Sequence, residues 1–256
     1  MKKNIELIVV PDVHGRSFWK EALPYIEAGV ETVFLGDYHD PYPDEGITEA
    51  ESLANFEEIV ALARRHSNVH LLLGNHDCGY WLDSDFCSCR HDYDNHLALK
   101  RLFDDNGDLF GFAYETVVAG RRFMLSHAGI HPVWVQRYQA LFGNPASMPS
   151  AATVNEAPSR NPVLFVEALG VYSNMRGWSG NDYGSIVWGD LRDYQLYGSQ
   201  YPDVVQIVGH TQISGPVSFG NIIGVDTRQC YYIGTDGRVL TLGDDTPPFE
   251  AVDDQE

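Results

Sequence analysis

Short apolar runs alternate with helical patterns along the first two-thirds of the chain. Three continuous runs rich in Val, Ile and Leu predict buried strands at 5–10, 32–35 and 69–73. Helices are predicted between them, at about 17–28 and 48–66. Thr48 and Glu51 match a capping box, in which each side chain accepts a hydrogen bond from the other residue's backbone N–H. Strands that alternate with helices in this way predict a parallel α/β sheet covered on both faces.

The later part of the chain has a less regular pattern. Two runs, 115–118 and 121–125, flank Ala119-Gly120, which predicts a hairpin. The other expected elements are helices at 132–142 and 161–170, a loop at 143–160, an irregular stretch at 177–201, and strands at 204–208, 222–225, 231–233 and 239–242. We expect one domain over 1–243, followed by an acidic and mobile tail at 244–256.

Composition and charge narrow the possible functions. Hydrophobic residues make up 44% and charged residues 21%, which excludes a disordered chain. The formal net charge of −19 repels polyanions, so we expect binding neither to nucleic acid nor to an anionic membrane. No apolar run approaches the ~18–20 residues of a membrane span. Because Glu6 also interrupts the first apolar stretch, the sequence predicts a cytoplasmic protein.

Five polar motifs directly follow predicted strands. They are PDVHG at 11–15, GDYHD at 36–40, GNHD at 74–77, SHAG at 126–129 and GHT at 209–211. In an open α/β sheet, ligands bind outside the carboxyl ends of the strands, so we expect these motifs to meet at one edge. Their carboxylate, imidazole and amide groups suit divalent transition metals, and the absence of cysteine argues against a structural zinc site.

The order of these motifs resembles the calcineurin-like metallophosphoesterase superfamily, whose pattern is D-x-H, G-D-x-x, G-N-H-[D/E], a lone H and then G-H. The match runs from Asp12 to His210. Cys78, VWGD at 187–190 and IGVDT at 223–227 are further similar to the branch that contains serine/threonine protein phosphatases and bacterial dinucleoside-tetraphosphate hydrolases. The resemblance implies a four-layer α-β-β-α sandwich with a dinuclear metal centre at the C-terminal ends of the strands.

The resemblance also implies a role for each motif residue. The first metal would be held by Asp12 and His14, the second by Asn75, His127 and His210, with Asp37 as the bridge. The ions would be two divalent metals, manganese first, with iron, zinc, nickel or cobalt as alternatives. A hydroxide between them would attack phosphorus in line, while His76, oriented by Asp77, would protonate the leaving oxygen.

Two departures from the family pattern affect the expected substrate. Gln212 stands where nuclease branches have a second histidine, and the GDYHDPY stretch at 36–42 lacks the arginine that grips phosphate in protein phosphatases. Phosphate contact must then come from elsewhere. Arg192 is the first candidate, with Arg16 and Arg176 behind it, because a guanidinium can bind a phosphoryl dianion through two hydrogen bonds. A solvated surface role for Arg192 remains the alternative.

The expected function is therefore hydrolysis of a phosphorylated small molecule or phosphoprotein by a protein-phosphatase-like enzyme. One alternative is a dinucleoside polyphosphate hydrolase, which the SHAGI stretch at 126–130 favours. The other is an inactive, metal-bound regulatory scaffold, although such a scaffold has no chemical reason to keep His76 and Asp77. The sequence predicts no oligomeric state.

Several nearby residues have simpler interpretations. Asp and Asn after strands often cap helices and fill turns. We expect His39 and Asp40 to form a supporting hydrogen-bond pair behind the metal ligands. The spacing of Cys78, Cys87, Cys89 and His91 fits no standard zinc pattern, which favours reduced, unrelated cysteines. Aromatic residues at 80, 81 and 86 are expected to pack a long loop rather than line a groove.

Overall fold

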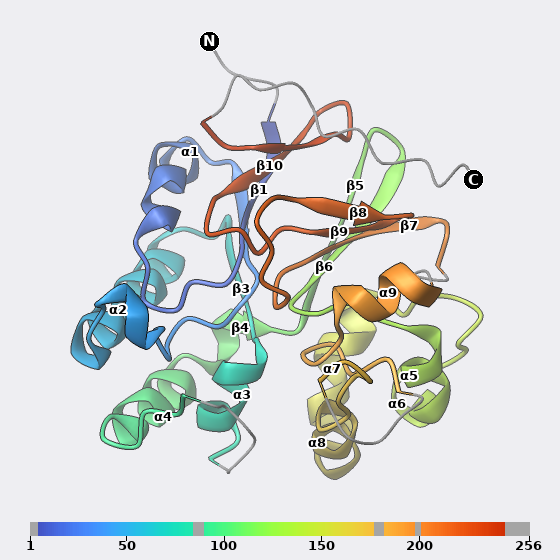
Figure 1. The fold of residues 1–256 in the computed structure, drawn as a ribbon, viewed down its shortest axis with the longest axis horizontal. Coiled ribbons are helices and arrows are strands. Elements are labelled where there is room, and N and C mark those ends of the chain that lie inside the picture. The colour runs from blue at the N-terminus through green and yellow to red at the C-terminus, as the bar shows by residue number, and fades with distance from the viewer. Residues whose placement is uncertain (1–4, 84–89, 177–181, 198–200, 244–256) are drawn as a thin grey trace.

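The computed structural model describes residues 5–83, 90–176, 182–197 and 201–243. Within these residues, two β-sheets pack face to face (Figure 1). The first has the order β11-β10-β1-β2-β3-β4, with these strands at Val239–Thr241, Tyr231–Gly234, Ile5–Val10, Glu31–Phe34, Val69–Leu72 and Phe110–Gly111. The second has the order β5-β6-β7-β9-β8, with these strands at Ala113–Val118, Arg121–Ser126, Val204–Val208, Ile222–Gly224 and Val217–Phe219.

Both sheets have a parallel centre. Strands β1, β2, β3 and β4 are parallel, and β10 and β11 extend them in the antiparallel direction. Strands β6, β7 and β9 are parallel, with β5 and β8 antiparallel at the two edges. Parallel neighbours end at the same edge of a sheet, so the polar motifs after β1, β2 and β3 emerge together, as do those after β6 and β7.

The alternation of side chains along β1 explains why the sheets form layers. Leu7 and Val9 are buried between the two sheets, together with Phe123 and Ile207 of the second sheet. Ile8 and Val10, which point to the opposite face, are buried in the cluster that includes residues of the helices. Each sheet therefore has one face toward the other sheet and one toward helices.

Helices cover the outer faces of the sandwich (Figure 1). On the first sheet these are η1 (Phe18–Ala22), α1 (Leu23–Glu27), α2 (Glu49–Arg65) and α4 (His96–Asp105); on the second they are α5 (Pro132–Arg137), α6 (Gln139–Phe142), α7 (Ala151–Arg160), α8 (Pro162–Leu169) and α9 (Leu191–Tyr197). The short elements η2 (Pro43–Glu45), α3 (Asn75–Trp81) and η3 (Gly107–Leu109) lie in the connections. The predicted α/β fold is confirmed, with the α-β-β-α order of layers.

The capping box at the start of α2 forms as predicted. The Thr48 hydroxyl accepts from the N–H of Glu51 at 3.2 Å, and the Glu51 carboxylate accepts from the N–H of Thr48 at 2.9 Å. The last turn contains Arg64 and Arg65, whose charges complement the helix dipole.

The predicted loop at 143–160 is wrong, because α7 occupies its second half. Ser150 caps this helix by accepting from the N–H of Thr153 at 3.1 Å. Tertiary contacts also hold it: Asn155 accepts from Phe112 N–H at 2.8 Å, and Glu115 from Ala151 N–H at 3.0 Å. The small and polar residues of this stretch show no helical pattern of apolar positions. The hydrogen bonds that hold the helix join residues far apart in the sequence, so they could not be predicted from it.

Other boundaries also differ from the prediction. The helix predicted at 17–28 is split before Pro24 into η1 and α1, and that at 132–142 is split at Tyr138 into α5 and α6. The stretch at 177–201, predicted to be irregular, contains α9, and helices α3 and α4 were not predicted. The predicted tail at 244–256 lies outside the described residues.

No helix in the described ranges has the length and apolar character to cross a membrane.

Candidate metal centre

Backbone hydrogen bonds join the motif turns at one edge of the sandwich. The N–H groups of Val13 and His14 both donate to the carbonyl of Asp37, at 3.1 and 2.7 Å. In the second sheet, the N–H of Gly209 donates to the carbonyl of His127 at 2.9 Å. These bonds fix the turn after β1 against the turn after β2, and the turn after β6 against the turn after β7.

Four motif residues have left-handed backbone conformations. These are His14 (φ 44°), Asp37 (φ 52°), Asp40 (φ 58°) and His210 (φ 60°). Such conformations cost a non-glycine residue about 1–3 kcal/mol each and concentrate at functional sites. All four strained residues lie in the turns that carry the candidate ligands.

Two glycines of the motifs are required by the close approach of carboxylates. A Cβ atom at Gly74 would collide with Asp37 Oδ1, and one at Gly209 would collide with Asp12 Oδ1. The carboxylates of Asp12 and Asp37 therefore lie directly against backbone, where a larger residue would displace them.

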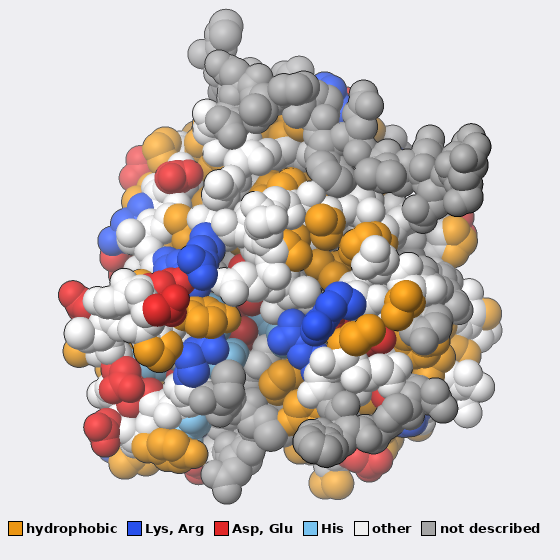
Figure 2. Space-filling model, in the orientation of Figure 1, with side chains coloured by type: hydrophobic (Ala, Val, Ile, Leu, Met, Phe, Trp, Pro, Cys, Tyr) orange, Lys and Arg blue, Asp and Glu red, His pale blue; other side chains and the backbone are white. Residues whose placement is uncertain are grey.

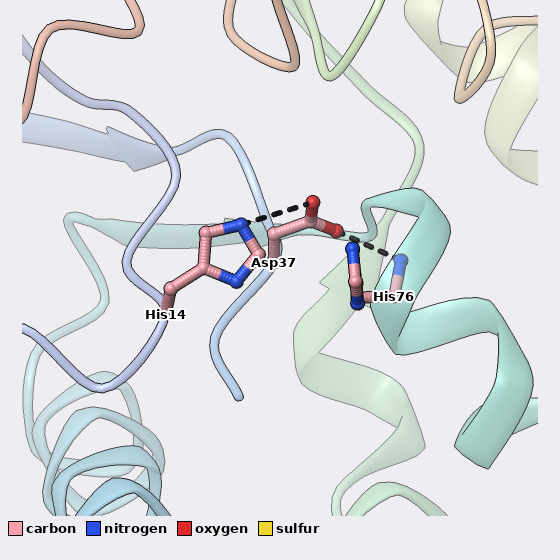
Figure 3. Close-up of side chains that lie close together, drawn as sticks. All are labelled: His14, Asp37 and His76. Atoms are coloured by element: carbon pink, nitrogen blue, oxygen red, sulfur yellow. Dashed lines mark hydrogen bonds and ion pairs between the residues drawn. The ribbon is translucent and has the colours of Figure 1, made fainter. Parts of the chain in front are cut away.

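The first group of potential ligands contains His14, Asp37 and His76 (Figure 3). His14 Nδ1 donates to the carbonyl of His39 at 2.9 Å, which leaves His14 Nε2 facing Asp37 Oδ2 at 3.6 Å. The other oxygen of Asp37, Oδ1, accepts from the backbone N–H of His76 at 2.9 Å. Asp37 Oδ2 is thus the oxygen turned toward the imidazoles.

The second group contains Asp37, His127 and His210. His127 Nδ1 donates to the carbonyl of Leu35 at 2.9 Å. Its Nε2 lies 3.0 Å from Asn75 Oδ1, 3.1 Å from His210 Nδ1 and 3.5 Å from Asp37 Oδ2. Asp37 therefore belongs to both groups, at the position predicted for a bridging ligand.

Asp12 completes the set from the turn after β1. Its two oxygens accept from the backbone N–H of His210, at 3.0 and 3.1 Å. Burial raises the pKa of Asp12, and the negative charge of Asp37 adds to that effect. A bound cation would offset the repulsion between these two buried carboxylates.

The residues present fit divalent metal ions. In each of the two groups, the ligand atoms lie within 4.8 Å of one another. Burial lowers the pKa of His14 and of His210 well below the usual value, which favours the neutral imidazole that binds metals. Among the described residues, no group forms a hydrogen bond to the buried Nε2 of His210. The structure thus brings together all six predicted ligands: Asp12, His14, Asp37, Asn75, His127 and His210.

The prediction that Asp77 orients His76 is wrong. His76 Nδ1 instead donates to Asp40 Oδ2 at 2.6 Å. Although burial acts to raise the pKa of Asp40, its hydrogen bonds with His76 and Tyr80 lower it overall, so the partner of the imidazole is an ionised carboxylate. His39 and Asp40 were expected to form a supporting pair behind the ligands. Each instead supports the site through another partner: Asp40 bonds to His76, and His39 bonds to Asp92 at 3.0 Å.

Asp77 instead binds backbone. Its carboxylate accepts from the N–H groups of Gly74 at 2.8 Å, Asp37 at 2.7 Å and Tyr38 at 3.1 Å. It occupies the third position of α3, where an acidic side chain caps the helix start, and its geometry excludes a bond to the imidazole one residue before it. Asp77 therefore joins two motif turns and supports the site only indirectly.

The three arginines proposed from the sequence differ in their surroundings. The guanidinium of Arg192 forms two bonds to Asp190, and its side chain is 56% exposed and does not line the cleft. Arg16 binds Glu45 through two bonds, at 2.6 and 2.9 Å. Arg176 also binds Asp190, at 2.6 Å, but it lines the cleft beside His210. Arg16 also donates to the backbone carbonyl of Asp12 at 3.3 Å, but of the three arginines only Arg176 lines the cleft.

Sequence reasoning missed the arginine closest to the general-acid candidate, Arg90. Its Nη2 lies 3.4 Å from His76 Nε2, and its guanidinium lies 3.8 Å from the centre of the Tyr42 ring. Arg90 belongs to none of the motifs and comes 13 residues after Asp77. The absence of an arginine at 36–42 indicated that another arginine must bind phosphate, but not which one.

A cleft opens over the candidate ligands. Its volume is about 380 Å³, and its lining includes Tyr42 and Arg90 together with Tyr172, Arg176 and Trp188. On the face drawn in Figure 2, basic side chains lie on both sides of a hollow in which acidic and histidine side chains are visible. A protein of net charge −19 thus presents positive charge at the mouth of this site.

The remaining predictions concern the residues after Asp77. Cys78 is buried and unpaired, Tyr80 is buried against His91, and Trp81 packs on Phe112. These positions agree with the expected packing roles. Cys87, Cys89 and Phe86 lie outside the described residues, so the prediction of unrelated, reduced cysteines remains untested at 87 and 89.

Comparison with known proteins identifies the family. A family model described as calcineurin-like phosphoesterase matches residues 5–214, which include all five polar motifs that follow the strands. A search of curated proteins found no match. The matched range covers most of the chain, from β1 to the turn after β7. The chain therefore belongs to the calcineurin-like phosphoesterase family, whose members are metal-dependent phosphoester hydrolases.

Proposed function

We propose that this chain hydrolyses phosphomonoesters in the manner of the protein-phosphatase-like branch, with two manganese ions. The observation that carries the proposal is the His76–Asp40 pair, at 2.6 Å, beside both Arg90 and the candidate metal ligands. This arrangement supports a mechanism in which an acid, a phosphate-binding group and metal ions act together in one cleft.

The metal ions would be held by the six candidate ligands, with Asp37 shared between the two sites. When bound, they supply positive charge for the phosphoryl oxygens and lower the pKa of a nearby water. The protein keeps the histidine ligands in one orientation, because His14 and His127 each donate Nδ1–H to a backbone carbonyl.

His76 is the proposed general acid. Its Nδ1–H is held by the ionised Asp40, which stabilises the imidazolium and leaves Nε2 on the side of the cleft near Arg90. When Arg90 turns from Nε2 toward the phosphoryl oxygens of a bound substrate, Nε2 can carry the proton that passes to the leaving oxygen. Proton transfer of this kind contributes about 10²–10⁴-fold to turnover.

Arg90 and Arg176 are the proposed phosphate-binding residues. They line the cleft on the His76 side and on the His210 side of the candidate ligands. Arg90 would bind phosphate in place of the arginine that is missing at 36–42. The ring of Tyr42, from that same stretch, stacks on its guanidinium. Guanidinium groups bind phosphoryl oxygens through two parallel hydrogen bonds.

The proposed substrate is a phosphorylated small molecule or phosphoprotein rather than nucleic acid. A long polyanion is repelled by the net charge of −19 outside the cleft. Gln212, at the position of the nuclease histidine, is exposed and does not line the cleft. We therefore expect no efficient cleavage of single- or double-stranded DNA.

A dinucleoside polyphosphate is the second candidate substrate. It is favoured by arginines beyond the cleft: Arg192 beside Arg176 on Asp190, and Arg16 and Arg228 together on Glu45. These groups could contact phosphates that follow the one being attacked. An inactive scaffold is less well supported, because such a scaffold has no chemical need for a general acid beside its metal ions.

Steady-state turnover across four substrates tests these alternatives. The manganese-loaded protein is assayed with p-nitrophenyl phosphate, a phosphoserine peptide, diadenosine tetraphosphate and DNA, and metal content is measured on the same sample. The proposal predicts turnover of the two monoesters. Preferential cleavage of the dinucleotide supports the second candidate, and two bound ions without any turnover support the scaffold.

A further inference from the structure

One buried hydroxyl group connects the proposed acid to the segment that carries Arg90. Tyr80 lies on α3 and is 1% exposed. Its hydroxyl donates to Asp40 Oδ1 and accepts from the backbone N–H of Asp92, the latter at 2.7 Å. The two partners belong to segments that are more than 50 residues apart in the sequence.

On the Asp40 side, the hydroxyl fixes the carboxylate. Asp40 Oδ2 accepts from His76 at 2.6 Å, and Oδ1 accepts from Tyr80. With a partner on each oxygen, the carboxylate cannot rotate without breaking one of the two bonds. The plane of the His76 imidazole therefore depends on Tyr80 through Asp40.

On the Asp92 side, the same hydroxyl fixes the start of the segment 90–95. Arg90 Nε donates to the carbonyl of Asp40 at 3.1 Å, and Asp92, two residues later, donates its N–H to Tyr80. The Asp92 carboxylate also binds His39 at 3.0 Å. Arg90 is thus held by two attachments. One is its own bond to the Asp40 carbonyl, and the other runs from Asp92 through the Tyr80 hydroxyl to the Asp40 carboxylate.

We propose that Tyr80 is a positioning residue that sets the geometry of His76 and Arg90 together. The inference rests on the proposed function, in which these two side chains act on the leaving oxygen and on the phosphoryl oxygens. Packing alone does not require the hydroxyl, because the ring already stacks on His91 with centroids 4.3 Å apart. The hydroxyl adds two hydrogen bonds and connects two functional groups.

Tyr80→Phe tests the proposal because it keeps the ring and removes only the hydroxyl. The matched control is Tyr231→Phe, since Tyr231 is also 1% exposed and its hydroxyl bonds to Thr227, away from the cleft lining. Each manganese-loaded variant is assayed for turnover of phosphoserine and p-nitrophenyl phosphate, for inhibition by inorganic phosphate, and for metal content.

We expect Tyr80→Phe to lose about tenfold in turnover of phosphoserine, the size of one hydrogen bond to a charged group, and about twofold with p-nitrophenyl phosphate, whose leaving group needs little protonation. The inhibition constant for phosphate should rise about threefold as the segment that carries Arg90 loses one of its two attachments, the bond from Asp92 to the hydroxyl. Asp40→Asn should lower turnover with the same dependence on the leaving group but leave phosphate inhibition unchanged, because the backbone carbonyl that binds Arg90 remains. Tyr231→Phe should match the parent in all of them.

Equal losses on both substrates, or a loss of bound manganese, would give Tyr80 a structural role and overturn the proposal. So would kinetics of Tyr80→Phe that match those of Tyr231→Phe. If Tyr80→Phe is partly unfolded, the ratio of the two turnover numbers still carries the test, because inactive protein lowers both equally. A parent protein that turns over neither substrate refutes the proposed function as well, whereas an active parent with an unchanged ratio refutes this inference alone.

Discussion

The floor and the wall of the cleft are built in different ways. The floor consists of the six candidate ligands, which are Asp12, His14, Asp37, Asn75, His127 and His210. Strained turns at strand ends hold it, and backbone bonds join those turns. The wall, which we define as Tyr42, Arg90 and Arg176, is held by side-chain contacts: Arg90 on Tyr42, and Arg176 on Asp190.

This difference in support predicts how each region responds to substitution. A floor residue has its position fixed by the sheets, so a substitution there removes a ligand and leaves the others in place. A wall residue depends on one or two side-chain contacts, so a substitution there shifts a binding group by a limited amount. We expect large losses of metal and activity from the floor and graded losses of substrate affinity from the wall.

The largest effect is expected from Asp37→Asn. Asp37 is the residue that both potential ligand groups contain, so its charge matters to both. Metal content should fall in both sites and turnover by more than about 100-fold, the upper range for changes next to metal ligands. Asp12→Asn should empty mainly the first site. Metal analysis with the exposed Asp44→Asn as control checks this, and full occupancy in Asp37→Asn would contradict the assignment.

His76→Asn should separate the acid from the ligands of the floor. We expect nearly normal metal content and a turnover loss of roughly 10²–10⁴-fold, larger for phosphoserine than for p-nitrophenyl phosphate. Asp40→Asn should show a milder form of the same pattern, because Asp40 binds the imidazole. Equal losses on both substrates would leave His76 with an electrostatic role, and loss of metal would make it a ligand.

Arg90→Ala should show the graded response of the wall. Phosphate inhibition should weaken about tenfold, as expected for the loss of one charge-assisted contact, with metal content unchanged. Arg192→Ala serves as the matched comparison, because that guanidinium already binds Asp190 and lies outside the cleft. A larger effect at Arg192 than at Arg90 would restore the interpretation made from the sequence.

The smallest kinetic effect is expected from Asp77→Asn. Its three acceptor bonds go to backbone N–H groups, so the change should lower the free energy of unfolding by about 1–2 kcal/mol, as for the loss of a helix cap. Thermal or denaturant unfolding measures this loss. Losses in turnover should be alike for both leaving groups. A leaving-group dependence as large as that of Asp40→Asn would mean that Asp77 does orient His76.

The floor could be predicted from the sequence because each of its residues directly follows an apolar run. Strand ends are local signals, and the spacing of the five motifs supplied their order. The partner of His76 could not be predicted, since Asp40 and Asp77 are both motif carboxylates and the bond from His76 to Asp40 joins two separate motifs.

The wall could not be predicted because its contacts are between segments far apart in the sequence. Arg90 reaches His76 through bonds from its segment to Asp40 and Tyr80, and none of these leaves a local pattern. The helix α7 was missed for the same reason, as its bonds from Asn155 and Glu115 connect it to β5 and its neighbouring backbone.

The central claim is that this cleft hydrolyses phosphoesters with metal ions held by its floor. The most direct test removes metal with a chelator, adds manganese back in steps, and measures ions per chain together with turnover of p-nitrophenyl phosphate. We expect two ions per chain at saturation, and activity that disappears on chelation and returns with occupancy. Turnover that persists in the metal-free protein, or that is unchanged in Asp37→Asn, would contradict it.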